Sequence, residues 1–224
     1  MPNWGEHLLI ANKILKKVKI DENLFLFGNI LPDVQDGYLV KGISNIVPHK
    51  INHYDIYDKF TLVKHKLGYE NFYDIYKEKL NNPIIFGYLA HLMTDAFWNN
   101  SFYTKKCINE NNESVGYITR SGELIKKPRL ELRTDKQKEF EIFQNYIYQN
   151  YDMKLPEYSQ KIVKNANIIE TININQDDVK KVVEYIKETK NNSKNQNQET
   201  KIYKIEELEK LIDETVEFVL GKIK

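Results

Sequence analysis

Residues 87–97 read GYLAHLMTDAF, an apolar run that holds one imidazole and one carboxylate. His91 and Asp95 are four residues apart, so a helix places both side chains on one face, one turn apart. An ionised carboxylate in apolar surroundings costs several kcal/mol unless a cation accompanies it. The pair therefore predicts either a histidine hydrogen-bonded to an aspartate in the core, or a divalent metal held by both side chains.

Helical patterns extend outward from this run in both directions. Asn82 and Pro83 are typical of a helix cap and first position, and they predict a helix to about residue 98. Near the start of the chain, Asn3 and Glu6 predict a capping box that opens an amphipathic helix to about residue 19. We expect further helices over residues 23–31, 60–80, 134–150, 157–170, 176–189 and 204–222. Thr134 with Gln137 is the expected cap of the helix over residues 134–150.

Two segments depart from this helical pattern. Residues 115–132 alternate around Ser121 and Gly122, which predicts a small β-hairpin excursion. Residues 190–201 contain no apolar side chain and predict a flexible linker or loop before the C-terminal helix. The expected fold is all-α, with residues 1–224 forming a single helical domain.

The composition excludes several classes of protein. The chain has 224 residues and a formal net charge of +1, so there is no strong nucleic-acid signal. We find no signal peptide in the first 30 residues and no apolar run long enough for a transmembrane segment. Cys107 is the only cysteine, which excludes an internal disulfide. We expect a cytoplasmic protein.

Metal-ligating residue types gather in the first half of the chain. All five histidines lie within the first 91 residues, and imidazole with carboxylate suits zinc. The candidate ligands are His7, Asp33, His49, His53, His65, His91 and Asp95. His65, between two lysines, is interpreted as an exposed side chain. Because the others are dispersed in sequence, they can share a metal only if tertiary folding gathers them.

Four stretches resemble the bacterial zinc-dependent phospholipase C family, whose fold is shared with the zinc-dependent single-strand nucleases. Residues 6–14 (EHLLIANKI) resemble its first helix, and residues 52–55 (NHYD) resemble a loop histidine followed by an aromatic residue. Residues 86–95 (FGYLAHLMTD) resemble its signature helix, and residues 28–33 (GNILPD) resemble its intracellular bacterial branch. The resemblance implies a multi-helix phospholipase C/nuclease-like domain.

The resemblance also implies roles for five residues. Asp33, His53, His91 and Asp95 match the ligands of one metal ion. Asp95 matches a carboxylate that bridges to a second ion, whose other side-chain ligand matches His7. Asp33 also matches the catalytic general base that acts on the attacking water. The implied cofactor is zinc, with one or two ions bound.

The chain departs from the family pattern in two places. Trinuclear members carry further histidines after the signature aspartate, whereas Trp98, Asn99 and Asn100 stand here and no histidine follows. The third metal site is therefore expected to be absent. Secreted members use an N-terminal tryptophan amine as a ligand, whereas Trp4 is internal and is interpreted as a packing residue.

Two functions follow from these observations. The first is a metal-dependent phosphoric ester hydrolase that uses metal-activated water on a small-molecule or lipid phosphodiester, such as a phospholipid headgroup or nucleotide. The alternative is a catalytically lapsed, metal-stabilised helical binding module. His49, four residues before His53, is either a further ligand or a hydrogen-bonding loop residue.

Overall fold

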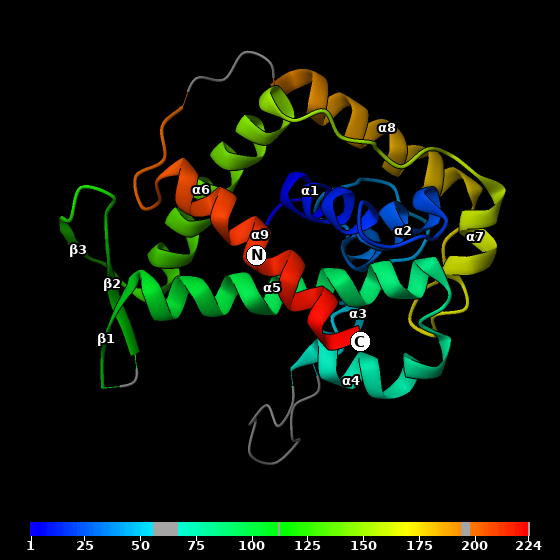
Figure 1. Ribbon diagram of the computed structural model, residues 1–224, viewed down its shortest axis with the longest axis horizontal. Helices are drawn as coiled ribbons and strands as arrows, with labels where there is room; N and C mark the ends of the chain where they lie inside the picture. The colour runs from blue at the N-terminus through cyan, green and yellow to red at the C-terminus, as the bar shows by residue number, and fades with distance from the viewer. Residues whose placement is uncertain (56–66, 112, 194–197, 224) are drawn as a thin grey trace.

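The computed structural model describes residues 1–55, 67–111, 113–193 and 198–223. Within these residues the chain is built of helices and one small sheet, so the expected all-α fold with a hairpin is confirmed (Figure 1). The α-helices are α1 (Trp4–Leu15), α2 (Glu22–Gly28), α3 (His49–Asn52), α4 (Gly68–Tyr76), α5 (Pro83–Lys105), α6 (Arg129–Asn150), α7 (Gln160–Ala166), α8 (Gln176–Asn192) and α9 (Ile205–Ile223). The 3₁₀-helices are Leu31–Asp36 and Lys77–Lys79.

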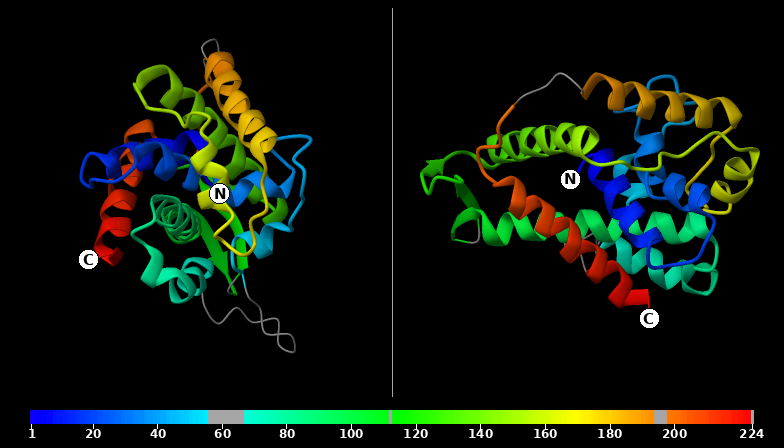
Figure 2. Two further views of the ribbon diagram at one scale, coloured as in Figure 1. Left: turned by 90° about the vertical axis from the view of Figure 1, so that its right-hand side faces the viewer. Right: turned by 45° about the horizontal axis from the view of Figure 1, so that its top comes forward.

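The helix α5 runs along the long axis of the molecule, and α1, α2, α4, α7 and α9 all contact it (Figure 1). Figure 2 shows α5 nearly end-on, surrounded by other helices. It begins as the sequence predicts, with the Ile84 amide donating to Asn82 Oδ1 at 3.0 Å and Pro83 in the first position. It continues to residue 105 rather than 98, because Ser101 and Phe102 extend its buried face.

Two glycines bring α2 directly against α5. A Cβ atom at Gly28 would lie 2.4 Å from the Ile84 carbonyl oxygen, and one at Gly87 would lie 2.3 Å from the Phe25 carbonyl oxygen. Real Cβ atoms do not approach so closely, so only glycine allows the two backbones to meet here. The contact places Asn29, which follows α2, beside the middle of α5, where its Nδ2 donates to the Gly87 oxygen at 3.3 Å.

The sheet has the antiparallel order β1 (Cys107–Glu110), β2 (Glu113–Ile118) and β3 (Leu124–Lys126). The predicted hairpin is formed by β2 and β3, and Gly122 adopts a positive φ of 89° in the turn between them. The additional strand β1 comes directly from the end of α5, so the sheet lies at one end of that helix (Figure 1).

The start of α6 was predicted at the wrong residue. The helix begins at Arg129, with Pro128 as its N-cap, rather than at Thr134. Proline fixes the backbone just before a helix, so the hairpin ends sooner than residue 132. Thr134 lies inside the helix, where its Oγ1 donates to the Leu130 carbonyl oxygen at 3.2 Å.

The segments predicted as helices over residues 60–80 and 157–170 differ from the prediction or lie partly outside the described residues. Helix α4 covers part of the predicted 60–80 helix, while residues 60–66, including His65, are outside the described residues. Helix α7 is shorter than the predicted 157–170.

The segment over residues 190–201 is not simply an exposed linker. Helix α8 extends into it as far as residue 192, and Ser193 and Thr200 are buried. The buried Glu139 carboxylate accepts the backbone amides of residues 201–203 at 2.7–3.2 Å. Two of these amides belong to Ile202 and Tyr203, buried residues just beyond the segment, so its C-terminal end is held against the core. Residues 194–197 lie outside the described part.

Buried apolar side chains between residues 4 and 219 form a core, and of the nine α-helices in the described part of the chain all but α3 contribute to it. None of the described helices is both long enough and apolar enough to cross a membrane.

Candidate metal centre

Four separate segments supply the five predicted site residues. His7 comes from α1, Asp33 from the 3₁₀-helix Leu31–Asp36, and His53 directly follows α3, while His91 and Asp95 project from α5. All five are buried, and none is more than 7 % exposed. The structure brings together side chains that are up to 88 positions apart in the sequence.

The distances between the donor atoms match a zinc coordination sphere. His53 Nε2 lies 3.3 Å from His91 Nε2, and Asp95 Oδ2 lies 3.3 and 3.4 Å from these two nitrogens. Asp33 Oδ1 lies 3.4 Å from His53 Nε2, and its Oδ2 lies 3.7 Å from His91 Nε2. Ligands at about 2.0–2.2 Å from a tetrahedral zinc ion are about 3.3–3.6 Å apart. The separations of His53 and His91 from each other and from the two carboxylates are thus those of zinc ligands. Two groups of donor atoms lie within 4.8 Å of one another, His7 with His91 and Asp95, and Asp33 with His49 and His53.

Backbone carbonyls fix the orientation of both imidazole rings. His91 Nδ1 donates to the Asn29 carbonyl oxygen at 2.8 Å, and His53 Nδ1 donates to the His49 carbonyl oxygen at 3.1 Å. A carbonyl oxygen can only accept, so each Nδ1 carries a proton and each Nε2 faces the cluster. Histidine ligands of metals are oriented in this way by their second ring nitrogen.

The two carboxylates give the space between the rings a negative charge that a cation would balance. Burial lowers the pKa of His53, but Asp33 and Asp95 outweigh it and raise that pKa to about 10. Burial likewise raises the pKa of each aspartate, and His91 and His53 reverse the effect and hold both carboxyl pKa values low. Without a metal, the proton on His53 offsets part of the negative charge of the two carboxylates. A divalent ion supplies two positive charges and replaces that proton.

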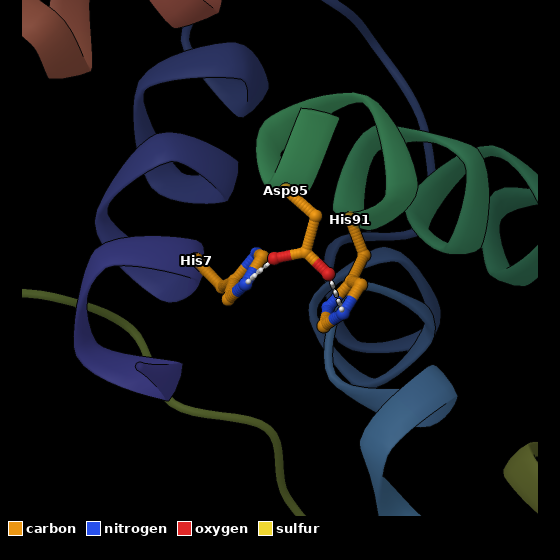
Figure 3. Close-up of side chains that lie close together, drawn as sticks. All are labelled: His7, His91 and Asp95. Atoms are coloured by element: carbon orange, nitrogen blue, oxygen red, sulfur yellow. Dashed lines mark ion pairs between the residues drawn. The ribbon is translucent and has the colours of Figure 1, made fainter. Parts of the chain in front are cut away.

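His7 meets the cluster from the other side of Asp95 (Figure 3). Its Nε2 lies 3.4 Å from Asp95 Oδ1, and its ring stacks on His91 with centroids 3.9 Å apart. Neither of its ring nitrogens has a hydrogen-bond partner among the described residues. Burial, then the charge of His91, lowers the pKa of His7 to about 4, so it is a neutral donor at pH 7. Asp95 thus presents one oxygen to each of two adjacent positions.

His49 lies at the edge of the same cluster. Its ring stacks on His53 with centroids 3.6 Å apart, and one of its ring nitrogens lies within 4.8 Å of donor atoms of Asp33 and His53. Its Nδ1 also lies 3.6 Å from Asp36 Oδ2, and its side chain is 32 % exposed. Its carbonyl orients His53, and its ring remains available as a further ligand.

Trp4 has a polar role that sequence reasoning did not find. Its ring packs edge-on against Tyr185, in keeping with a packing residue, but its Nε1 also donates to Asp33 Oδ2 at 3.1 Å. Trp4 precedes His7 by one helical turn, so both side chains reach the cluster from one face of α1. That shared face was the only sequence signal for this contact.

A cavity of about 410 Å³ opens beside the cluster. His49, His53 and Asp95 contribute to its wall, and Leu92, Tyr69, Tyr103 and Asn99 are also part of the lining. Its mixed polar and aromatic surface offers room for a small organic phosphate next to the metal position.

The comparisons with known proteins agree with this geometry. The family model for zinc-dependent phospholipase C matches residues 6–214, nearly the whole chain, and includes every residue of the cluster. No curated protein and no solved structure matches the chain significantly. The chain belongs to the zinc-dependent phospholipase C family.

Proposed function

We propose that this protein is a zinc-dependent hydrolase of phosphodiesters, with Asp33, His53, His91 and Asp95 as ligands of the principal ion. The observation that carries the proposal is the pair of Nε2 atoms 3.3 Å apart, each with its Nδ1 bonded to a carbonyl and both facing two carboxylates. Zinc bound there would lower the pKa of a water ligand towards about 7 and polarise the phosphoryl group.

Asp33 would act as the general base. Its Oδ2 accepts from Trp4, and its Oδ1 faces His53, so the carboxylate is held in one orientation. The low pKa of Asp33 keeps it ionised at neutral pH and able to accept a hydrogen bond from the attacking water. This role is the one that the family resemblance implies for Asp33.

His7 and the bridging Asp95 would hold a second ion. Both ring nitrogens of His7 lack partners among the described residues, although the ring is fully buried. Such a group is costly unless something binds it. A second ion would stabilise charge on the leaving oxygen, as in two-metal phosphodiester hydrolysis.

The substrate we propose is a small-molecule or lipid phosphodiester, because the cavity combines polar residues with Leu92 and Tyr103. We further propose that the chain acts as one helical domain in the cytoplasm. Its single cysteine, Cys107, is typical of proteins in reducing compartments.

The test combines metal analysis with turnover. Purified protein should contain one or two zinc ions by elemental analysis and hydrolyse bis(4-nitrophenyl) phosphate. Chelated protein should lose this activity and regain it with added zinc. His91→Ala should lose both metal and activity, whereas Asp152→Asn, an exposed substitution outside the cluster, should lose neither. Stoichiometric zinc without hydrolysis of aryl or lipid phosphodiesters would instead support a metal-stabilised binding module.

A further inference from the structure

Lys136 on α6 is a buried cation without a carboxylate partner. Its side chain is nearly inaccessible, and its Nζ donates to Asn99 Oδ1 at 2.6 Å. Among the described residues, this amide oxygen is its hydrogen-bonding side-chain partner, and no carboxylate lies within ion-pair distance. Burial lowers the pKa of Lys136 to about 8, so the side chain remains protonated at neutral pH. An unpaired buried charge is costly and indicates that an anion binds nearby.

Asn99 connects this cation to the candidate metal centre. It lies four residues after Asp95 on α5, on the same face of the helix, and it lines the cavity beside the cluster. An ammonium group only donates hydrogen bonds, so Asn99 must turn its oxygen towards Lys136. Its Nδ2 group is then left without an acceptor among the described residues.

In the described part of the chain, the other groups around Lys136 supply no carboxylate at contact distance. The N-terminal amine of Met1 lies beside it, and the charge of Arg133 acts on it at longer range. The Lys136 Nζ lies 4.9 Å from the ring centroid of Tyr103 and 5.3 Å from that of Phe102. These rings stabilise a cation but carry no net charge. Asp95 attracts Lys136 at longer range, and a metal bound to Asp95 would neutralise that attraction.

We propose that Asn99 binds a phosphoryl oxygen of the substrate through Nδ2, and that Lys136 is the positioning residue that orients and polarises this amide. The proposal rests on the proposed hydrolase function. Asn99 and Lys136 would then make the site selective for charged substrates, because the positive potential of Lys136 favours an anionic diester over a neutral ester. The donors would lie on the wall of the cavity next to the metal position.

The test uses two substitutions and a matched control in the zinc-loaded full chain. Lys136→Met removes the charge at similar length, and Asn99→Asp keeps an acceptor for Lys136 but replaces the donor with a carboxylate. Lys138→Met makes the same change at an exposed position of α6. We expect the KM for bis(4-nitrophenyl) phosphate and the inhibition constant for inorganic phosphate to rise about tenfold in the first two variants. Zinc content, kcat to within about threefold, and the control variant should be unchanged.

An equal phosphate inhibition constant in wild type and Asn99→Asp overturns the proposal, whether or not Lys136→Met folds. A loss of kcat with unchanged KM and phosphate inhibition also overturns it, because it assigns the pair a structural role. Calorimetry of inorganic phosphate binding requires no turnover, so it tests the anion site separately from the hydrolase function. If wild type is inactive but binds phosphate more tightly than Asn99→Asp, the anion site is supported while the hydrolase function fails.

Discussion

Asp95 contributes to both candidate metal positions through its two oxygens. Its Oδ2 lies within 3.4 Å of His53 and His91 nitrogens, and its Oδ1 lies 3.4 Å from His7. Asp95→Asn removes the negative charge and replaces one acceptor with a donor. We predict that this variant binds zinc at least about 100-fold more weakly. Elemental analysis after dialysis measures the loss, and full retention of zinc would contradict it. The exposed Asp152→Asn is the control.

His7 distinguishes a one-ion from a two-ion centre. It contacts the cluster through Asp95 Oδ1 and the face of His91, but not through the atoms that surround the first position. If two ions bind, His7→Ala should lose one zinc per chain and keep the other, and turnover should fall. Unchanged metal content and turnover would instead make His7 a buried packing residue of α1.

How far the site could be predicted from the sequence depends on how far apart its residues lie along the chain. His91 and Asp95 form a helical pair that local spacing shows directly, and resemblance to a family added His7, Asp33 and His53. The contacts of Trp4 and Lys136 were not predicted. Their partners lie 29 and 37 residues away, and no local periodicity relates such positions. Only the packing of α1 and α6 on their neighbours brings these groups to the centre.

The close contact between α2 and α5 positions one of the metal ligands. A Cβ at Gly87 would lie 2.3 Å from the Phe25 oxygen and 2.8 Å from the Asn29 nitrogen, so Gly87→Ala must push α2 away. We predict a loss of about 1–3 kcal/mol in the free energy of unfolding. Zinc affinity should also fall, because the Asn29 carbonyl that orients His91 moves.

Denaturant unfolding and zinc titration measure both effects of Gly87→Ala. The control is Gly221→Ala in α9, where an added Cβ meets nothing within 4 Å. Alanine is the better helix former, so this variant should be as stable as wild type or slightly more stable. Equal stability of the two variants would refute the steric explanation.

Helix boundaries could be predicted where a cap is local. Asn82 accepts the Ile84 amide, and the Asn3 amide donates to Glu6. Both bonds lie within one turn, and both helix starts are confirmed. The start of α6 was wrong because Pro128 precedes it and a weaker cap pattern at Thr134 was preferred. The C-terminal end of residues 190–201 is bonded to the distant Glu139 through the Lys201 amide, a contact that the composition of that segment does not reveal.

Zinc would connect elements across the whole molecule, because its ligands come from α1, α5, a 3₁₀-helix and the end of α3. Metal that binds only the native state stabilises it by about 4 kcal/mol at a thousand times its Kd. Chelation should therefore lower the Tm by about 10 °C, and added zinc should restore it. An unchanged Tm after verified demetallation would argue for a hydrogen-bonded core without metal.

The metal-free protein should show opposite pH dependences on the two sides of neutrality. The pKa of His53 is raised from 6.5 to about 10 in the fold, so its stabilisation is complete below pH 6.5 and is lost as the pH rises towards 10. The pKa of His7 is lowered to about 4, so its contribution is lost as the pH falls from 6.5 towards 4. The alkaline loss and the acidic loss each change the free energy of unfolding by at most about 1.4 kcal/mol per pH unit.

Bound zinc should abolish the loss of stability above pH 6.5. Because a zinc ligand must be unprotonated, binding displaces the His53 proton, and zinc affinity should rise up to about tenfold per pH unit between pH 6.5 and 10. Tm measured from pH 5 to 10 should peak near 6.5 without metal and stay level above 7 with zinc. His53→Gln, measured without metal, should lose the alkaline fall but keep the acidic one, which comes from His7. A flat metal-free profile from pH 7 to 10 would show that His53 is not held as an imidazolium between Asp33 and Asp95.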